Sequence, residues 1–329
     1  MRTYLPFAFA FLLPLAASAQ SFGGLGGSGP SFSLSLEPQY PVPYSQAMIS
    51  ASSDSIDLAN ATMIISVAGK EVYRGSVHPT AATLGKAGSV TRANVTISSG
   101  GKSYNQSVSI QTQDVTLIAE PVSSAPVLYS GKPSVPSEGT TRVVAVANLR
   151  TTDGAQVDPA TLSYSWTVDD TRIAESSGIG KSAILVASPL PYRARTVSVA
   201  IASQDGALVG GDSLTLSPRD PLVRIYENDP LLGIRFNRAL SGTYTITGAE
   251  STLFATPFSV PTGNGAPLLQ WFLNGSAAQT GNSITLRPTG DGAGNASLSL
   301  TASSGNNSIA TASLSLIFGA NPSTNFFGL

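Results

Sequence analysis

The side chains that most often carry catalysis are scarce in this sequence. The chain of 329 residues contains one histidine, His78, which precedes Pro79, and it contains no cysteine. Metal clusters built from histidine and cysteine, and Cys–His dyads, are therefore excluded. Serine is abundant, but no Gly-x-Ser-x-Gly turn accompanies it, so a Ser–His–Asp triad is not expected. Glycosidases need two facing carboxylates, and the 19 acidic residues show no such signature. We predict no catalytic residue, no cofactor and no enzymatic activity.

Aspartates in predicted turns are the candidates for calcium chemistry. They are Asp54, Asp57, Asp169, Asp170, Asp229 and Asp291. Their carboxylates are the hard oxygen ligands that calcium prefers, but no segment has the ligand spacing of an EF-hand loop. Turns also favour aspartate for conformational reasons alone. We predict no metal ligand, and a carbohydrate- or calcium-dependent binding module remains the alternative function.

Arginines and large apolar residues are concentrated between positions 219 and 238. The candidates for partner binding in this stretch are Arg224, Tyr226, Leu231, Leu232, Ile234, Arg235 and Phe236. One interpretation is a strand followed by a loop that packs at a joint between two units. The other is an exposed patch, because arginine and aromatic residues are enriched at protein interfaces. Phe326 and Phe327, in a tail after the last predicted strand, are further candidates for contact with a partner.

Charge and targeting signals restrict the class of protein. Charged residues make up 11% of the chain and the formal net charge is −1, so neither nucleic acid nor an anionic membrane is expected as a partner. Residues 1–19 combine one arginine, a short apolar run and the sequence Ala17-Ser18-Ala19, which is typical of a secretory signal peptide. The run is too short to span a membrane, and no transmembrane helix is expected once the signal is removed. We therefore predict an exported protein that is periplasmic, cell-surface or extracellular.

Two tryptophans lie in similar surroundings, about one hundred residues apart. Trp166 stands three residues before the pair Asp169-Asp170, and Trp271 three residues before Asn274-Gly275. A third copy without tryptophan has Ala68-Gly69 at the turn. Such pairs tolerate positive φ and join two strands in a tight hairpin. We expect Trp166 and Trp271 to anchor the core of a two-sheet structure.

Alternating patterns without helical periodicity run through the rest of the chain. Ser297 to Leu300 and Ser313 to Leu316 alternate serine with leucine, as a half-buried strand does. Short strands separated by turn residues indicate an all-β fold, a tandem array of three immunoglobulin-like β-sandwich domains. The predicted divisions are a signal peptide (1–19), a Gly/Ser-rich leader (20–30), three domains (31–120, 121–218 and 219–318) and a tail (319–329). Residues 115–119 form the last predicted strand of the first domain.

The second unit carries a resemblance to a known group of domains. Tyr164-Ser165-Trp166 before an acidic turn, followed by the segment from Pro191 to Val199, resembles PKD and related bacterial immunoglobulin-like domains of surface proteins. The chain lacks the Phe-Gly-Asp-Gly that usually follows the tryptophan strand in PKD domains. The three-unit pattern is also similar to uncharacterised exported proteins of small-genome bacteria. The resemblance implies a structural spacer, an adhesin or a component of a cell-surface or periplasmic assembly, whose partner is another protein of the surface or envelope.

Overall fold

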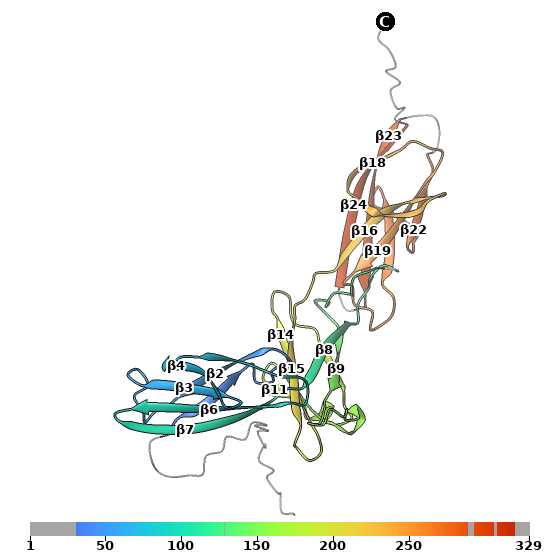
Figure 1. Ribbon diagram of the computed structural model, residues 1–329. Helices are drawn as coiled ribbons and strands as arrows, with labels where there is room; N and C mark the ends of the chain where they lie inside the picture. The colour runs from blue at the N-terminus through green and yellow to red at the C-terminus, as the bar shows by residue number, and fades with distance from the viewer. Residues whose placement is uncertain (1–30, 128, 289–292, 306–307, 320–329) are drawn as a thin grey trace, which may run out of the picture. The chain divides into compact units, whose positions relative to one another are not determined.

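β-strands are the main regular elements of the described chain. The structure is a computed structural model that describes residues 31–319 except Leu128, residues 289–292 and residues 306–307. The predicted signal peptide, the leader, Phe326 and Phe327 lie outside the described residues. Among those described, the only helices are two 3₁₀ turns, η1 (Pro159–Thr161) and η2 (Ala174–Ser176) (Figure 1). The prediction of an all-β fold of tandem sandwiches is confirmed.

The first two sheets contain the first seven strands. One sheet has the order β1-β2-β5 and the other the order β4-β3-β6-β7. Side chains from both sheets, among them Ile49, Ile65 and Ile97, form one buried core. The strands are β1 (Ser33–Glu37), β2 (Gln46–Ser52), β3 (Thr62–Val67), β4 (Lys70–Ser76), β5 (Thr80–Thr83), β6 (Val90–Ser99) and β7 (Lys102–Gln111).

The next two sheets repeat this order. They are β13-β9-β8 and β11-β10-β14-β15, and the short strand β12 also pairs with β10. The strands are β8 (Asp114–Pro121), β9 (Thr140–Asn148), β10 (Ser163–Val168), β11 (Thr171–Arg172), β12 (Gly178–Ile179), β13 (Ala183–Ala187), β14 (Arg195–Ala202) and β15 (Val209–Leu216).

Strand β8 corrects one strand assignment made from the sequence. Residues 115–119 were expected to close the first domain, but β8 pairs with β9 and so opens the second pair of sheets. The alternating pattern of residues 115–119 is compatible with a strand in either the first or the second pair of sheets. Which strand it pairs with is decided by contacts distant in the sequence, which the local pattern does not show. The boundaries of the three domains stay a prediction. The chain divides into two compact units, one of which combines the residues up to Val115 with Ala147–Ser163 and Ala200–Gly211.

The last two sheets contain two strands that the others lack. Their orders are β17-β16-β19-β22 and β18-β24-β23-β20-β21. Without β17 and β18, the order matches the first two pairs of sheets. The strands are β16 (Leu222–Asp229), β17 (Gly233–Leu240), β18 (Gly242–Ile246), β19 (Ser251–Phe258), β20 (Leu268–Leu273), β21 (Ser276–Thr280), β22 (Ser283–Leu286), β23 (Gly294–Ser304) and β24 (Ser308–Phe318).

A tight hairpin follows the third of the strands that all three pairs of sheets share. Its two central residues have positive φ in each case: 49° and 82° at Ala68-Gly69, 47° and 63° at Asp169-Asp170, and 50° and 80° at Asn274-Gly275. Two successive positive φ angles define a type I′ turn, whose twist matches that of the flanking strands. The hairpins predicted from these residue pairs are confirmed.

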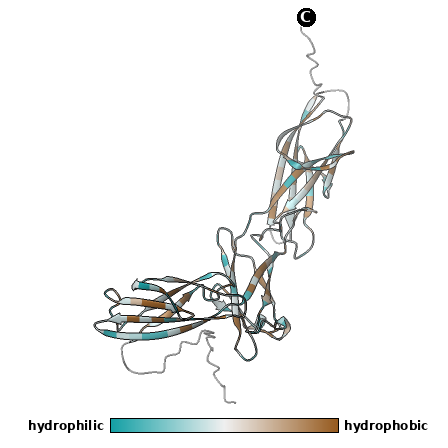
Figure 2. Cartoon of the chain, viewed as in Figure 1, coloured by the Kyte–Doolittle hydropathy of each residue, from teal (hydrophilic) through white to brown (hydrophobic). Residues whose placement is uncertain are grey.

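Both tryptophans are fully buried and make the same hydrogen bond. The indole Nε1–H of Trp166 donates to the Lys181 carbonyl at 2.9 Å, and that of Trp271 donates to the Gly281 carbonyl at 2.8 Å. A buried indole needs such an acceptor, because an unpaired polar group in a core is costly. Figure 2 shows hydrophobic segments along the strands, and with no cysteine in the chain, packing of this kind has to stabilise the fold.

Candidate partner-binding site

The residues predicted to bind a partner lie on one hairpin, which we call the edge hairpin. It consists of β16, the turn at residues 230–232, and β17. Arg224 and Tyr226 lie on β16, Leu231 and Leu232 in the turn, and Ile234, Arg235 and Phe236 on β17. The structure therefore brings all seven residues onto one hairpin and distributes them over its outer face, its tip and its free edge.

The outer face of the edge hairpin carries a row of aromatic rings. Val223 and Ile225 belong to the buried core, so the alternate residues Arg224 and Tyr226 point to the other side of the sheet. The ring of Phe236 lies 5.2 Å from that of Tyr226 and 6.2 Å from that of Phe254 on β19, both edge to face.

Packing buries the side chain of Tyr226 more than that of Phe236. Tyr226 is only 6% exposed, and this burial raises the pKa of its phenol, whereas Phe236 is 45% exposed. Sequence reasoning missed Phe254. The signal that would have found it is its place between the inward-facing Leu253 and Ala255, which sets it on the outer face.

The tip of the edge hairpin holds two leucines in solvent. Leu231 is 92% exposed and Leu232 is 72% exposed. Their backbone N–H groups donate to Oδ1 of Asp229 at 2.8 and 3.0 Å, which lowers the pKa of that carboxyl group. The turn aspartate thus acts as a backbone acceptor that fixes how the two leucines are displayed.

The register of β17 against β16 is interrupted by a bulge of several residues. Tyr226 pairs with Ala239 and Asn228 pairs with Ile234, so Glu227 alone stands opposite residues 235–238. Bulges re-aim side chains and are frequent next to functional sites. This bulge contains both arginines of β17, Arg235 and Arg238.

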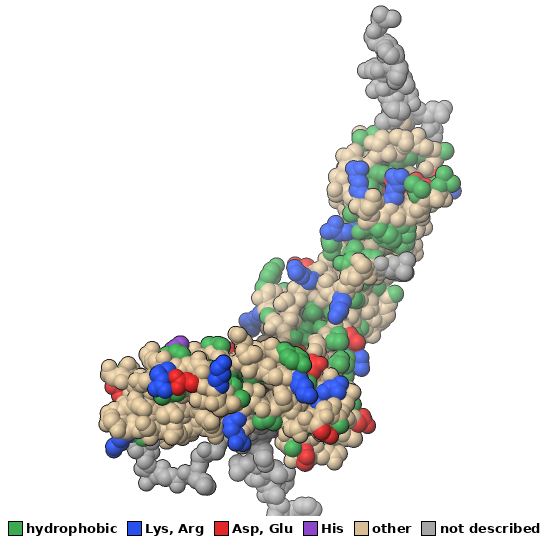
Figure 3. Space-filling view, in the orientation of Figure 1, with side chains coloured by type: hydrophobic (Ala, Val, Ile, Leu, Met, Phe, Trp, Pro, Cys, Tyr) green, Lys and Arg blue, Asp and Glu red, His purple; other side chains and the backbone are tan. Residues whose placement is uncertain are grey.

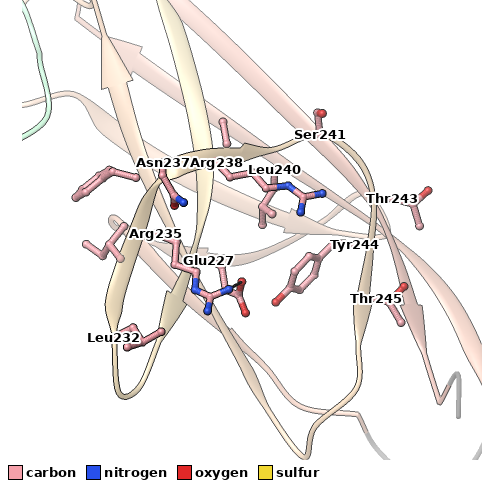
Figure 4. A pocket seen from close by; sticks show the side chains of 13 residues that line it. Glu227, Leu232, Arg235, Asn237, Arg238, Leu240, Ser241, Thr243, Tyr244 and Thr245 are labelled. Atoms are coloured by element: carbon pink, nitrogen blue, oxygen red, sulfur yellow. Dashed lines mark hydrogen bonds and ion pairs between the residues drawn. The ribbon is translucent and has the colours of Figure 1, made fainter. Parts of the chain in front are cut away.

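A cavity of about 880 Å³, which we call the edge groove, lies along β17 and β18. Figure 4 shows Arg235 and Arg238 pointing from β17, and the ring of Tyr244 from β18, into the space between these strands. The Tyr244 hydroxyl lies 2.7 Å from the Ser251 hydroxyl, within hydrogen-bond distance, and burial raises the pKa of the phenol. The ring is therefore a neutral wall of the groove.

The two arginines of the edge groove differ in their pairing. Arg235 lies 3.5 Å from a carboxylate oxygen of Glu227 and 3.8 Å from one of Asp229. Across the described part of the chain, no carboxylate forms an ion pair with Arg238, which is exposed. The groove therefore offers one guanidinium that forms no ion pair with the residues the structure describes.

The joint with the preceding segment lies at the start of β16 and the end of β19. The Ser124 N–H donates to the Val260 carbonyl at 2.8 Å, and the Ser259 N–H donates to the Ser124 carbonyl at 3.0 Å. Tyr129 also packs edge-on against Phe258 at 6.0 Å. The start of the stretch 219–238 contributes to this joint, because the Arg219 N–H donates to the Val135 carbonyl at 2.8 Å, whereas the tip at Leu231 and Leu232 is exposed to solvent.

The turn aspartates serve local roles in the fold. Asp57 accepts from the Ala59 N–H at 3.0 Å, and Asp169 accepts from the Thr196 N–H at 2.9 Å. Over the described ranges, no three His, Cys, Asp or Glu side chains gather in a way that could hold a metal ion. Asp291 lies outside the described residues. In Figure 3 charged side chains are scattered over a mostly uncharged visible surface.

Comparisons with known proteins give no family. No family model matches the chain, and no curated protein matches it. Solved structures similar to it include a central fibronectin-III array of RIM-binding protein, at 9% identity and a TM-score of 0.28, covering 88% of this chain and 96% of that one. Another contains immunoglobulin domains 1–5 of Sidekick-1, at 11% identity and a TM-score of 0.30, covering 89% and 60%.

A third similar structure contains fibronectin(III)-like modules of CbhA from Clostridium thermocellum. It is 12% identical with a TM-score of 0.24, and the match covers 63% of this chain and 95% of that one. These likenesses assign no activity to the chain. In the described part of the chain, no helix has the length and apolar character needed to cross a membrane. The strand order itself gives the architecture, tandem antiparallel two-sheet sandwiches of immunoglobulin-like type.

Proposed function

We propose that this protein is a non-enzymatic, exported protein that acts as a structural spacer, an adhesin or a component of a cell-surface or periplasmic assembly. In this proposal it holds a protein partner at the edge hairpin and the edge groove. The sequence of residues 1–19, typical of a signal peptide, supports export. The low proportion of charged residues supports a role that does not depend on nucleic acid.

One observation carries the proposal: β17 and β18 end the two sheets of the last pair and have no counterpart in the other two pairs. The shared strands supply most of the buried core of the last pair, to which β18 adds Ile246. The added strands bring exposed leucines, a half-exposed phenylalanine and an arginine that forms no ion pair with the described residues, and they border the edge groove. Residues of these types supply much of the binding energy at protein interfaces. We infer that the exposed residues of this addition serve recognition.

The proposal is tested by photo-crosslinking in the cells that produce the protein. A benzoylphenylalanine replaces Phe236 in one variant and Ile179, which is exposed on β12, in a control variant. We expect a covalent adduct with a second protein from position 236 and none from position 179. Equal adducts from both positions, or none from position 236, would contradict a partner site on the edge hairpin.

A further inference from the structure

The edge groove is bordered by two strands that each end a sheet. β17 is the last strand beside β16, and β18 is the last strand beside β24. A strand at the end of a sheet has one row of backbone N–H and C=O groups that no neighbouring strand pairs. An extended peptide can satisfy such a row by adding as one more strand. A polysaccharide has no matching ladder of amides, so the two free edges favour a peptide.

The dimensions of β18 suit a short peptide segment. β18 has five residues, Gly242–Ile246, which corresponds to about 17 Å at the rise of an extended strand. Tyr244 of β18 and Arg235 and Arg238 of β17 point into the groove beside this edge (Figure 4). A peptide on the free edge would present every second side chain to these groups.

The charge of the groove indicates which side chain the peptide carries there. Arg235 is already near Glu227 and Asp229, whereas Arg238 forms no ion pair with any residue that the structure describes. A guanidinium binds a carboxylate through two parallel hydrogen bonds, which gives geometric as well as energetic selectivity. The complement of the groove is thus an aspartate or a glutamate.

We propose that the edge groove binds an extended acidic segment of the partner protein, which adds as a strand to the free edge of β18 and places a carboxylate on Arg238. This inference rests on the proposed function, because it specifies the part of the partner that is bound.

The first test measures how a charged peptide binds the full chain. The probe is a fluorescein-labelled nine-residue peptide, Thr-Val-Glu-Val-Thr-Val-Glu-Val-Thr, and its neutral match has glutamine in place of each glutamate. By fluorescence polarisation, we expect the glutamate peptide to bind roughly tenfold more tightly than the glutamine peptide.

Arginine variants locate the carboxylate contact. Arg238→Gln should remove most of the difference between the two peptides, while the exposed control Arg172→Gln on β11 should keep it. Both changes lie on exposed side chains, so circular dichroism should show unchanged folding. If Arg238→Gln leaves the difference between the peptides intact, the placement of the carboxylate is wrong.

The second test addresses strand addition. Only every second N–H of an added strand faces the sheet, so two glutamate peptides are compared, one N-methylated at the odd and one at the even central positions. We expect one of them to lose binding and the other to keep it within about threefold. Equal loss or equal retention would overturn the proposal of strand addition.

A third probe, polygalacturonate, separates the peptide from an anionic polysaccharide. The contrary outcome is that polygalacturonate binds in an Arg238-dependent manner while the unmethylated glutamate peptide does not bind. In that case the acidic-peptide proposal is wrong and the ligand is a carbohydrate. Failure here is distinct from failure of the proposed function. If position 236 gives an adduct with a protein but the glutamate peptide does not bind, the proposed protein partner is retained. Only the proposal that the partner binds through an acidic strand is then discarded.

Discussion

Asp169 and Thr196 are joined by two hydrogen bonds that close the second tight hairpin onto β14. The Asp169 N–H donates to the Thr196 carbonyl at 3.0 Å, and the Thr196 N–H donates to Oδ1 of Asp169 at 2.9 Å. Asn274 and Ser297 repeat both bonds, each at 2.8 Å. The first hairpin has Ala68 at this position, so its side chain cannot accept, and only the backbone bond to Arg92 remains, at 3.0 Å.

The hydrogen bonds between Asp169 and Thr196 predict that two substitutions of Asp169 destabilise the fold to different extents. Asp169→Ala removes the side-chain acceptor and the ion pair with Arg195 at 2.8 Å, and should destabilise the second pair of sheets by about 1–2 kcal/mol. Asp169→Asn keeps an acceptor for the Thr196 N–H, as Asn274 does in the third copy, and should cost less than half as much. Denaturant unfolding followed by the fluorescence of Trp166, in a Trp271→Phe background, measures both. Equal costs would show that the hydrogen bond contributes little.

Truncation of a buried tryptophan should unfold its surroundings. Trp166→Ala leaves a cavity and deprives the Lys181 carbonyl of its donor, at a cost of about 3–5 kcal/mol. Since domains have about 5–15 kcal/mol of stability, protection in β10 and β14 should fall sharply. Hydrogen exchange with mass spectrometry measures this, and Trp166→Phe, which preserves an aromatic ring, is the matched control. Unchanged protection in the alanine variant would mean that Trp166 is not a core anchor.

The exposed tip predicts a separation of binding from stability. Leu231→Ser with Leu232→Ser should leave the melting temperature within about 2 °C, because surface substitutions usually change stability by less than 0.5 kcal/mol. The same double change should decrease the adduct formed from position 236. Phe236→Ser is the comparison, since this ring packs on Tyr226 and Phe254 and its loss should lower stability as well. Loss of folding in the double leucine variant would contradict the solvated tip.

The lowered pKa of Asp229 predicts how the tip responds to acid. The ionised carboxylate is the form that accepts from the Leu231 and Leu232 N–H groups. Because the folded pKa lies below the ordinary value of 3.8, the stabilisation is fully present above pH 3.8 and is lost as the pH falls through the folded pKa. A pH titration by NMR should show the two amide resonances shifting together below pH 3.8. In Asp229→Asn they should not shift in that range, and a shift there would assign the effect to another group.

Sequence patterns predicted the local elements well and the added strands poorly. The three tight hairpins depend on two adjacent residues that tolerate positive φ, and such pairs are visible in any sequence. The alternation of leucine and serine in β23 likewise indicates which face of the strand is buried. The bulge opposite Glu227 depends on pairing with β16, and the short β18 exists only because β24 lies beside it. Neither of these strand pairings leaves a pattern in the nearby sequence. The sequence therefore predicts that the residues of the edge hairpin form a patch, but not that they border a groove.

The parallel pairing of β18 with β24 has a mechanical consequence. Its register runs from Gly242 opposite Leu314 to Ile246 opposite Phe318, with both strands pointing the same way. Opposite forces applied at Gly242 and at Phe318 slide the two strands along each other. All the evenly spaced hydrogen bonds of the ladder then bear the load together instead of opening one after another. The same strand that borders the edge groove therefore also acts as a clamp against a pull applied between Gly242 and Phe318.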